Sequence, residues 1–336
     1  MTEPDAGTAV DANAPRCYRH PDRITYVSCT RCGRPICPDC MRPASVGFQC
    51  PEEVKETRRT TRAPRTVLGG RVQAGGRDVT SVLIGINVVI FVIMTASGTG
   101  FISGSPSLLF ARFADLPGHI EILNADQTHR ATLNGVANGE WYRLVTSMFM
   151  HFGIIHLALN MYVLLLVGPP LEKSLGRIRF TALYLIAGFG GSVASFVFGS
   201  VTELGAGASG AIFGLFGAYY IVARRIGAET GPILATIGIN IAISFAISNI
   251  DIRAHLGGLA TGALVGAIMA YAPRGPYRTW IQAGGSAVVL AALVVAAVVH
   301  APTVRQDQRG EFPPAYILSL PAAPLPADSP RSTSAP

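Results

Sequence analysis

FTALYLIAGFGGSVASFVFGS, residues 180–200, contains no Asp, Glu, Lys or Arg. At about 1.5 Å per residue, a helix of this length crosses the roughly 30 Å hydrocarbon core of a bilayer. Further stretches without these four residue types lie at 79–97, 144–168, 204–223, 230–250, 254–273 and 281–304. Helices buried in a large soluble protein would mostly keep a polar face, and these stretches have none. The sequence therefore predicts an all-α polytopic membrane protein with seven spans.

Positive charge gathers at alternate ends of the predicted spans. The chain is 49% hydrophobic and 14% charged, with a formal net charge of +7. Basic residues precede the first span and follow the second, fourth and sixth: Arg58, Arg59, Arg62, Arg65, Arg71, Arg77, Lys173, Arg177, Arg179, Arg224, Arg225, Arg274 and Arg278. Because Lys and Arg collect on the cytoplasmic side, the pattern predicts a multi-pass protein of the cell membrane. Its N-terminus should be cytoplasmic and its C-terminus extracytoplasmic, and its basic excess should face the lipid bilayer rather than nucleic acid.

Composition divides the chain into six segments. Residues 1–16 are predicted to be disordered, 17–53 to form a small cysteine-rich module, and 54–78 to be a basic linker. The main membrane domain is placed at 79–273 and a seventh helix at 281–304. The tail at 305–336 is rich in Pro and Ala and is predicted to be disordered. The loop at about 98–140 is long enough to hold short structure of its own.

The six cysteines occur in pairs with two-residue gaps. The pairs read Cys17-x2-His20, Cys29-x2-Cys32, Cys37-x2-Cys40 and Cys50-x2-Glu53. Such gaps let one turn present two ligands to a tetrahedral zinc ion. Three disulfides are the alternative, but they rarely persist in the reducing cytosol where this segment is predicted to lie. Structural zinc is therefore the favoured interpretation.

The order of these pairs resembles a cross-braced, B-box-like zinc finger. The resemblance implies that Cys17, His20, Cys37 and Cys40 hold one ion, and that Cys29, Cys32, Cys50 and Glu53 hold a second. Glu53 departs from the pattern because Cys or His is expected there. The second site is thus either completed by its carboxylate, which zinc accepts, or weak or vacant. The module is expected to dock an unidentified cytosolic partner.

Few polar groups interrupt the predicted spans, and each is a functional hypothesis because ionisable groups are costly in a membrane. Ser209 begins the fourth span and His255 the sixth, at matching depth near the outer face. In the second span, His156 and Asn160 are about 40° apart on a helix and share a face. His151 lies about 180° from Asn160 on the same count and is assigned to structure.

These residues fall within motifs that resemble the rhomboid family of intramembrane serine proteases. The motifs are Trp141-Tyr142-Arg143, the run His151-x4-His156-x3-Asn160, Gly207-Ala208-Ser209-Gly210, and Ala254-His255-Leu256-Gly257-Gly258. They occur in the family's order across roughly 79–273. The resemblance implies a six-helix catalytic bundle, to which this chain adds a seventh helix.

The resemblance also implies roles for four residues. Ser209 would be the nucleophile and His255 its base, with no catalytic cofactor. His156 and Asn160, together with the backbone N–H of Ser209, would stabilise the oxyanion. Substrates would be single-span membrane proteins with a helix-destabilised segment near the outer face.

Two departures from the family pattern leave this chemistry intact. Tyr142 separates Trp141 from Arg143, and Phe213 stands where a Tyr commonly stacks on the catalytic His. Arg143 is predicted to anchor its loop to lipid headgroups. Gly258, Gly262 and Gly266 repeat every fourth residue and offer a flat face for close helix packing.

Three rival functions remain to be weighed. A catalytically inactive rhomboid-like protein that binds membrane clients typically lacks the Ser or the His, and this chain keeps both. A transporter would need broken helices and charge at the midplane. A nucleic-acid reader would use the finger and its Arg-rich linker, but the positions of those arginines beside a span are explained by topology and anionic lipid.

Overall fold

The computed structural model describes residues 13–60, 65–70, 78–102, 105–123, 130–246, 250–308 and 315–317. The chain divides into two compact units, residues 1–64 and residues 65–336. Each unit is described by itself.

The N-terminal unit is built around its cysteines. A short 3-10 helix, η1 (Pro38–Cys40), leads into the antiparallel pair β1 (Arg42–Pro43) and β2 (Phe48–Gln49), and α1 (Pro51–Thr60) follows. Ile36 is fully buried among five buried cysteines. With so few apolar side chains, a unit of this size depends on cross-links or metal for a core.

Two predicted boundaries of this region change. The segment predicted to be disordered at 1–16 is ordered from residue 13, where Ala14 is buried and Arg16 pairs with Ile24; residues 1–12 lie outside the described part. The predicted linker begins inside α1 and also contains a structured turn at 65–70. There Leu68 is buried, and its carbonyl accepts a hydrogen bond from the Gln282 amide at 3.1 Å.

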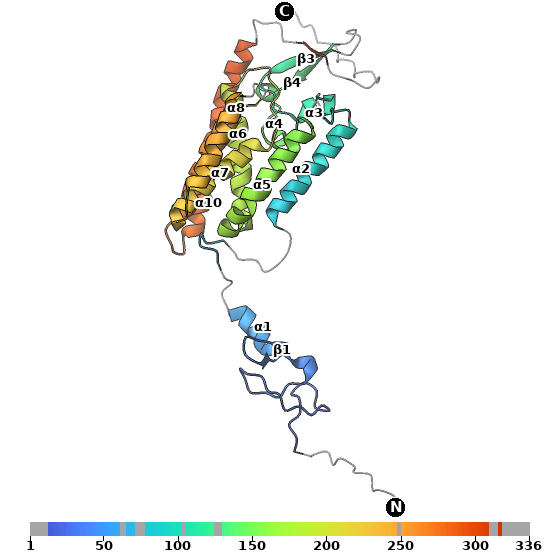
Figure 1. The fold of residues 1–336 in the computed structure, drawn as a ribbon, viewed down its shortest axis with the longest axis vertical. Helices are drawn as coiled ribbons and strands as arrows, with labels where there is room; N and C mark the ends of the chain where they lie inside the picture. Colours follow the sequence, from blue (N-terminus) through green and yellow to red (C-terminus); the bar gives the residue numbers. More distant parts are fainter. Residues whose placement is uncertain are drawn as a thin grey trace, which may run out of the picture. The chain divides into compact units, whose positions relative to one another are not determined.

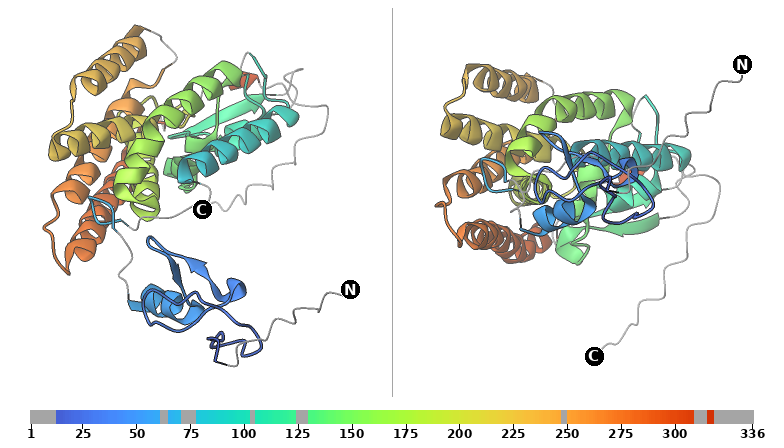
Figure 2. Two further views of the ribbon diagram at one scale, coloured as in Figure 1. Left: turned by 60° about the horizontal axis from the view of Figure 1, so that its bottom comes forward. Right: turned by 90° about the horizontal axis from the view of Figure 1, so that it is seen from below.

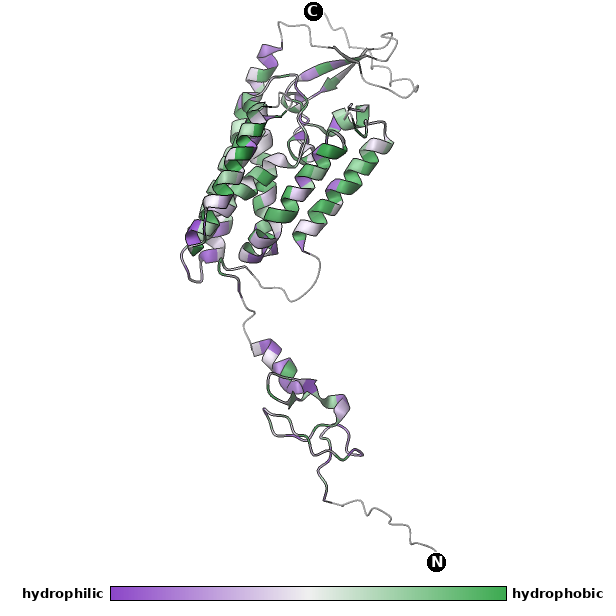
Figure 3. Cartoon of the chain, in the orientation of Figure 1, coloured by the Kyte–Doolittle hydropathy of each residue, from purple (hydrophilic) through white to green (hydrophobic). Residues whose placement is uncertain are grey.

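Seven helices of the second unit fall on the seven predicted spans (Figure 1). They are α2 (Val79–Ala96), α5 (Gly153–Leu175), α6 (Arg177–Phe198), α7 (Ser209–Ile226), α8 (Gly231–Ala246), α9 (Ile252–Tyr271) and α10 (Arg278–Asp307). Among the described helices, α2, α5, α6, α9 and α10 are long and apolar enough to cross a membrane, and α8 is a shorter apolar helix. Apolar residues predominate along the visible faces of these helices, with more hydrophilic residues toward their ends (Figure 3). The chain is a multi-pass membrane protein.

The second span begins later than predicted. The stretch expected to be helical from 144 holds a short helix, α4 (Arg143–Thr146), and a 3-10 turn, η3 (Ser147–Phe149), before α5 begins at Gly153. Gly153 adopts a φ of +78°, and a Cβ there would lie 2.6 Å from the Ile102 carbonyl oxygen, so only glycine suits this corner. His151 therefore precedes the helix, and the helical angle assigned to it does not apply.

The long first loop has structure of its own. It contains α3 (Leu108–Phe113), the antiparallel strands β3 (His119–Leu123) and β4 (Arg130–Asn134), and the 3-10 helix η2 (Val136–Asn138). Its buried apolar side chains, including Leu116 and Ile120, form a cluster of their own. The prediction of short structure in this loop is confirmed.

The predicted disordered tail contributes to the same loop. Helix α10 continues to Asp307, and β5 (Ala315–Ile317) pairs in parallel with β3. The Gln308 side chain accepts from the backbone N–H of His119 and donates to its carbonyl, each at 3.0 Å. The disorder prediction is wrong for these residues, and residues 309–314 and 318–336 lie outside the described part.

Helices α6, α7 and α9 approach one another closely because glycines line their contacts. A Cβ at Gly258 would lie 2.0 Å from the Gly210 carbonyl oxygen, and one at Gly262 would lie 2.1 Å from that of Gly214. A Cβ at Gly190 of α6 would lie 2.2 Å from the Thr261 hydroxyl. The backbones of α7 and α9 thus meet with no side chain between them. The flat glycine face predicted on α9 is confirmed.

Replacing Gly262 with Ala should destabilise the bundle, because the added methyl group must push α9 away from α7. Overpacking of this kind costs about 1–3 kcal/mol. Thermal unfolding in detergent would measure it as a lower Tm. Gly85→Ala on α2 is the matched control, since a Cβ there meets nothing within 4 Å and Ala favours helix more than Gly. Equal Tm values for the two variants would contradict the close contact.

Candidate active site and metal-binding module

Ser209 and His255 meet at one end of the bundle. Ser209 is the first residue of α7, and the Nε2 atom of His255 lies 2.8 Å from its Oγ atom. Phe213 stacks on the imidazole, with ring centroids 4.1 Å apart and an interplanar angle of 13°. His255 is buried and Ser209 is half-buried. The structure brings the two residues of the predicted dyad together, and the ring of Phe213 lies against the imidazole.

The other ring nitrogen of His255 has a partner that sequence reasoning missed. Its Nδ1 atom lies 2.7 Å from the Oγ atom of Ser244 on α8. Asp251 is not that partner, because its carboxylate caps the N-terminus of α9 and accepts a hydrogen bond from Ser195. No spacing relation ties Ser244 to His255, so only the packed structure reveals the contact.

His156 faces the turn that carries the serine. Gly207 adopts a φ of +140°, and a Cβ there would lie 3.0 Å from Nε2 of His156 and 3.5 Å from Oγ of Ser209. The Nδ1 atom of His156 accepts a hydrogen bond from the Phe152 N–H at 3.3 Å. Because a neutral imidazole carries one hydrogen, that hydrogen is on Nε2, which points toward the serine as a donor.

Asn160 lies one turn along the same face of α5. Its amide donates to the carbonyl of His156 at 2.9 Å, and the side chain is 93% buried. An amide group carries two hydrogens, so one remains for another acceptor. His151 is also buried, with its ring centroid 5.2 Å from that of His156 and no hydrogen-bond partner for its ring nitrogens among the described residues. The shared face of His156 and Asn160 is confirmed.

Comparison with known proteins places this arrangement in a family. The family model described as "Rhomboid domain" matches residues 138–272, which include Ser209 and His255. Putative rhomboid protease YdcA of Bacillus subtilis is 40% identical over 158 residues, covering 46% of this chain and 79% of that protein. The chain belongs to the rhomboid family.

Other curated rhomboid proteins match over smaller shares of their length. Rhomboid protease GluP of Bacillus subtilis is 40% identical over 183 residues, which is 51% of this chain and 34% of that protein. RHOMBOID-like protein 4 of Arabidopsis thaliana is 31% identical over 216 residues, which is 58% of this chain and 52% of that protein. The cysteine-rich module lies outside the residues that the rhomboid model matches.

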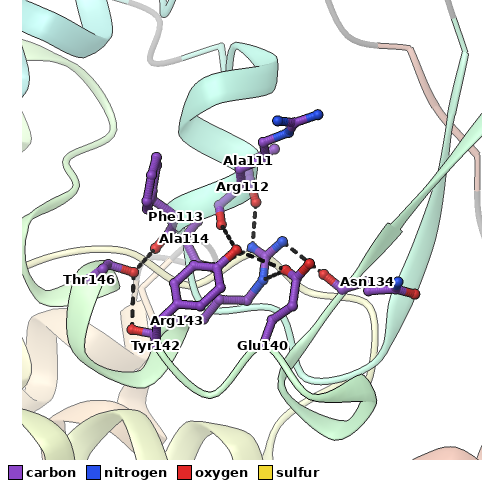
Figure 4. A network of polar contacts seen from close by, with 9 residues as sticks. All are labelled: Ala111, Arg112, Phe113, Ala114, Asn134, Glu140, Tyr142, Arg143 and Thr146. Carbon is purple, nitrogen blue, oxygen red and sulfur yellow. Dashed lines mark hydrogen bonds and ion pairs between the residues drawn. The ribbon is translucent and has the colours of Figure 1, made fainter. Parts of the chain in front are cut away.

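The predicted contact of Arg143 with lipid headgroups is wrong for this rhomboid protein. Its side chain is completely buried. The guanidinium donates to the Glu140 carboxylate at 2.6 Å and to the carbonyl oxygens of Ala111, Ala114 and Asn134 at 2.6, 2.8 and 2.8 Å (Figure 4). The rigid fork of donors fits carbonyls that converge from α3 and from the end of β4. Arg143 therefore holds the first loop together from within.

Backbone bonds join that loop to the segment before the serine. Asp115 and Gly205 exchange two hydrogen bonds of 2.8 Å, and the Gly207 N–H donates to the Ser147 carbonyl at 3.0 Å. The Asp115 carboxyl is buried and has no hydrogen-bond partner among the described residues. Burial and the nearby Asp251 raise its pKa and Arg143 opposes them, with a net pKa of about 8. The carboxyl is therefore mostly neutral at pH 7.

The cysteines of the N-terminal module gather into the two predicted groups. The ligand atoms of Cys17, His20, Cys37 and Cys40 all lie within 4.8 Å of one another. Nδ1 of His20 lies 3.2 Å from Cys37 Sγ and 3.4 Å from Cys40 Sγ. Donors about 2.0–2.3 Å from one tetrahedral ion are separated by roughly 3.5–3.8 Å. The spacing fits zinc.

The thiols of this first group also favour a cation. Burial opposes ionisation of Cys17, but hydrogen bonds from the backbone at Cys37, Arg19 and His20 outweigh it and lower its pKa to about 6. Burial and the adjoining Cys17 and Cys37 sulfurs raise the pKa of Cys40 to about 11. A bound zinc ion would relieve this repulsion, because it takes each cysteine as a thiolate.

The second group contains Cys29, Cys32 and Cys50, with 3.7 Å between the sulfurs of Cys32 and Cys50. Glu53, the predicted fourth ligand, is not part of it. Its carboxylate pairs with the Arg31 guanidinium at 3.2 Å instead. The structure thus offers four donors to a first ion and three to a second.

Replacing Arg143 with Lys should loosen the first loop, because an ammonium cannot reach four acceptors spread around a planar fork. Each hydrogen bond lost to a charged donor costs about 1.5–3 kcal/mol. Limited proteolysis and thermal unfolding in detergent would show faster cleavage within 105–140 and a lower Tm. Arg112→Lys is the matched control, because Arg112 is exposed. Equal cleavage rates and equal Tm values for the two variants would instead support the predicted contact of Arg143 with lipid.

Proposed function

We propose that this protein is an intramembrane serine endopeptidase that uses Ser209 and His255 as a catalytic dyad. The observation that carries the proposal is the 2.8 Å contact between His255 Nε2 and Ser209 Oγ. A histidine at hydrogen-bond distance from a serine hydroxyl is the geometry of an activated nucleophile. The names of two bacterial relatives, which call them rhomboid proteases, favour the same activity.

The proposed reaction follows from the hydrogen-bond roles of these groups. Ser209 Oγ attacks the substrate carbonyl carbon while Nε2 of His255 takes its proton. The imidazolium then gives that proton to the leaving amine, and water hydrolyses the acyl-enzyme by the same route. No catalytic metal or cofactor is required.

Three donors would stabilise the oxyanion. The Ser209 N–H lies in the first turn of α7, where backbone N–H groups lack intrahelical acceptors and the helix dipole favours negative charge. Nε2–H of His156 points at the same turn, and Asn160 has a second amide hydrogen to offer. Stabilisation of this kind is worth about 10²–10³ in kcat for one donor in a soluble protease.

The proposed substrates are single-span proteins of the same bilayer. A peptide carbonyl inside a helix is hydrogen-bonded, so the segment to be cut must unwind, and Gly or Pro eases this step. We place the protein in the cell membrane with a cytoplasmic N-terminus, which puts the dyad near the extracytoplasmic face. This orientation rests on the distribution of Lys and Arg.

We also propose that the N-terminal module holds structural zinc on the cytoplasmic side and docks a cytosolic partner. Cys17, His20, Cys37 and Cys40 would form a closed four-ligand site. Cys29, Cys32 and Cys50 would form a second, weaker one whose fourth ligand is not Glu53. The module lies across the bilayer from the dyad in the proposed orientation, so it takes no part in the chemical step.

Ser209→Ala and His255→Ala should each abolish cleavage of a model single-span substrate in detergent, with expression and Tm retained. A fluorophosphonate probe should label the wild-type protein and not Ser209→Ala. Ser286→Ala is the matched control, because that hydroxyl bonds back to the Gln282 carbonyl of its own helix at 2.8 Å. Substantial cleavage by Ser209→Ala would refute the dyad. Lack of labelling and cleavage in folded wild-type protein would favour an inactive client-binding rhomboid.

Metal analysis of the purified full-length chain should return at least one zinc per molecule. Cys37→Ser should remove the first ion, because it takes one of four ligands. Glu53→Ala should leave the count unchanged, since Glu53 pairs with Arg31, whereas Glu53→Cys should tighten the second site because it would add a fourth thiolate. Fluorophosphonate labelling of Ser209 should persist in all three variants. A lower zinc count in Glu53→Ala would restore Glu53 as a ligand.

A further inference from the structure

Helix α8 turns one hydroxyl inward toward the proposed active site. Its buried residues are Ile233 and Ser244, and the rest of its surface is half-buried or exposed. In both views of Figure 2, α8 (gold) lies at the edge of the bundle. Ser244 is 95% buried, and its Oγ atom lies 2.7 Å from Nδ1 of His255. A buried hydroxyl on a peripheral helix therefore contacts the proposed base.

Counting hydrogens fixes the direction of each bond. The Ser244 hydroxyl has one hydrogen, and its Oγ atom lies 2.7 Å from the Asn240 carbonyl oxygen, which can only accept. The hydroxyl therefore donates to Asn240 and must accept from His255. Nδ1 of His255 then carries the imidazole hydrogen, and Nε2 presents a lone pair to Ser209.

We infer that Ser244 is a positioning residue that holds His255 in the tautomer and orientation needed to accept the proton of Ser209. This inference rests on the proposed protease function. The Ser244 hydroxyl bonds to His255 and to the Asn240 carbonyl of its own helix, so it would act on the reaction through His255. In serine proteases with a third member, a carboxylate performs this task. Here a neutral hydroxyl performs it, with its own hydrogen occupied by a carbonyl.

The other groups around His255 cannot supply this control. Phe213 stacks on the face of the ring, which limits tilting but does not choose between the two nitrogens. Asp251 carries the carboxylate nearest in sequence, and its oxygens are engaged by backbone N–H groups of α9 and by Ser195. Ser244 is the residue whose chemistry selects the tautomer.

The test compares Ser244→Ala with Ser244→Thr in the purified full-length protein in detergent. Loss of one hydrogen bond is worth about 0.5–1.5 kcal/mol, so Ser244→Ala should lower kcat on a model single-span substrate by about two- to tenfold with KM unchanged, and should lower Tm only slightly. Ser244→Thr, which keeps the hydroxyl, should recover most of the rate. Thr236→Ala is the matched control, because that hydroxyl bonds to the Pro232 carbonyl of the same helix.

A second readout does not depend on catalysis. The ¹⁵N NMR signals of the His255 ring, assigned by comparison with His255→Ala, should report hydrogen on Nδ1 in wild type and a mixture of tautomers in Ser244→Ala. An unchanged tautomer in Ser244→Ala would overturn the inference, as would an unchanged kcat. If the extra methyl group of Ser244→Thr prevents folding, the NMR comparison of wild type with Ser244→Ala still tests the inference. Wild-type protein that neither cleaves nor binds the probe would refute the proposed function, while the tautomer would still test the contact.

Discussion

Two helix backbones can touch only where neither carries a side chain, and α7 and α9 meet on such a face. Gly210 and Gly214 on one helix oppose Gly258 and Gly262 on the other at distances that exclude even a methyl group. Ser209 lies next to the first of these glycines, and His255 lies three residues before Gly258. The approach of the two backbones thus sets the 2.8 Å contact between Ser209 Oγ and His255 Nε2, and the other elements arrange hydrogen-bond donors around it.

The two histidines near the serine carry opposite tautomers for local reasons. A backbone N–H occupies Nδ1 of His156 and leaves a hydrogen on Nε2, so this ring donates. A hydroxyl oxygen faces Nδ1 of His255 and draws the hydrogen there, so this ring accepts through Nε2. The His156 ring can therefore donate a hydrogen bond to an oxyanion, and the His255 ring can accept a proton from a hydroxyl group. The hydrogen-bond partners that fix the two tautomers, a backbone N–H and a serine hydroxyl, are both neutral.

Sequence patterns predicted the parts of this molecule that depend on spacing. Charge-free stretches located the spans, the family motifs named Ser209, His255, His156 and Asn160, and paired cysteines predicted the two ligand groups. The helical face shared by His156 and Asn160 follows from geometry alone. The start of α5 did not follow, because apolar residues continue through a corner that only Gly153 marks.

The features that sequence reasoning missed depend on contacts between distant segments. Arg143 has the composition of a lipid anchor, and its burial follows only when carbonyls of α3 and β4 converge on it. Ser244 shares no motif with His255. Glu53 had the right spacing for a ligand, but Arg31 provides a competing cation. In the tail, Pro-rich composition predicted disorder, while an exposed edge of β3 accepts residues 315–317 as a strand.

The order of the helices along the chain has a consequence for biosynthesis. Ser209 and His255 are 46 residues apart, so at about 5–20 residues per second the ribosome adds the histidine roughly 2–9 s after the serine. Until α9 enters the membrane and packs against α7, the proposed nucleophile lacks its proposed base. In the proposed mechanism, a nascent chain therefore cannot cleave neighbouring membrane proteins before α9 is in place.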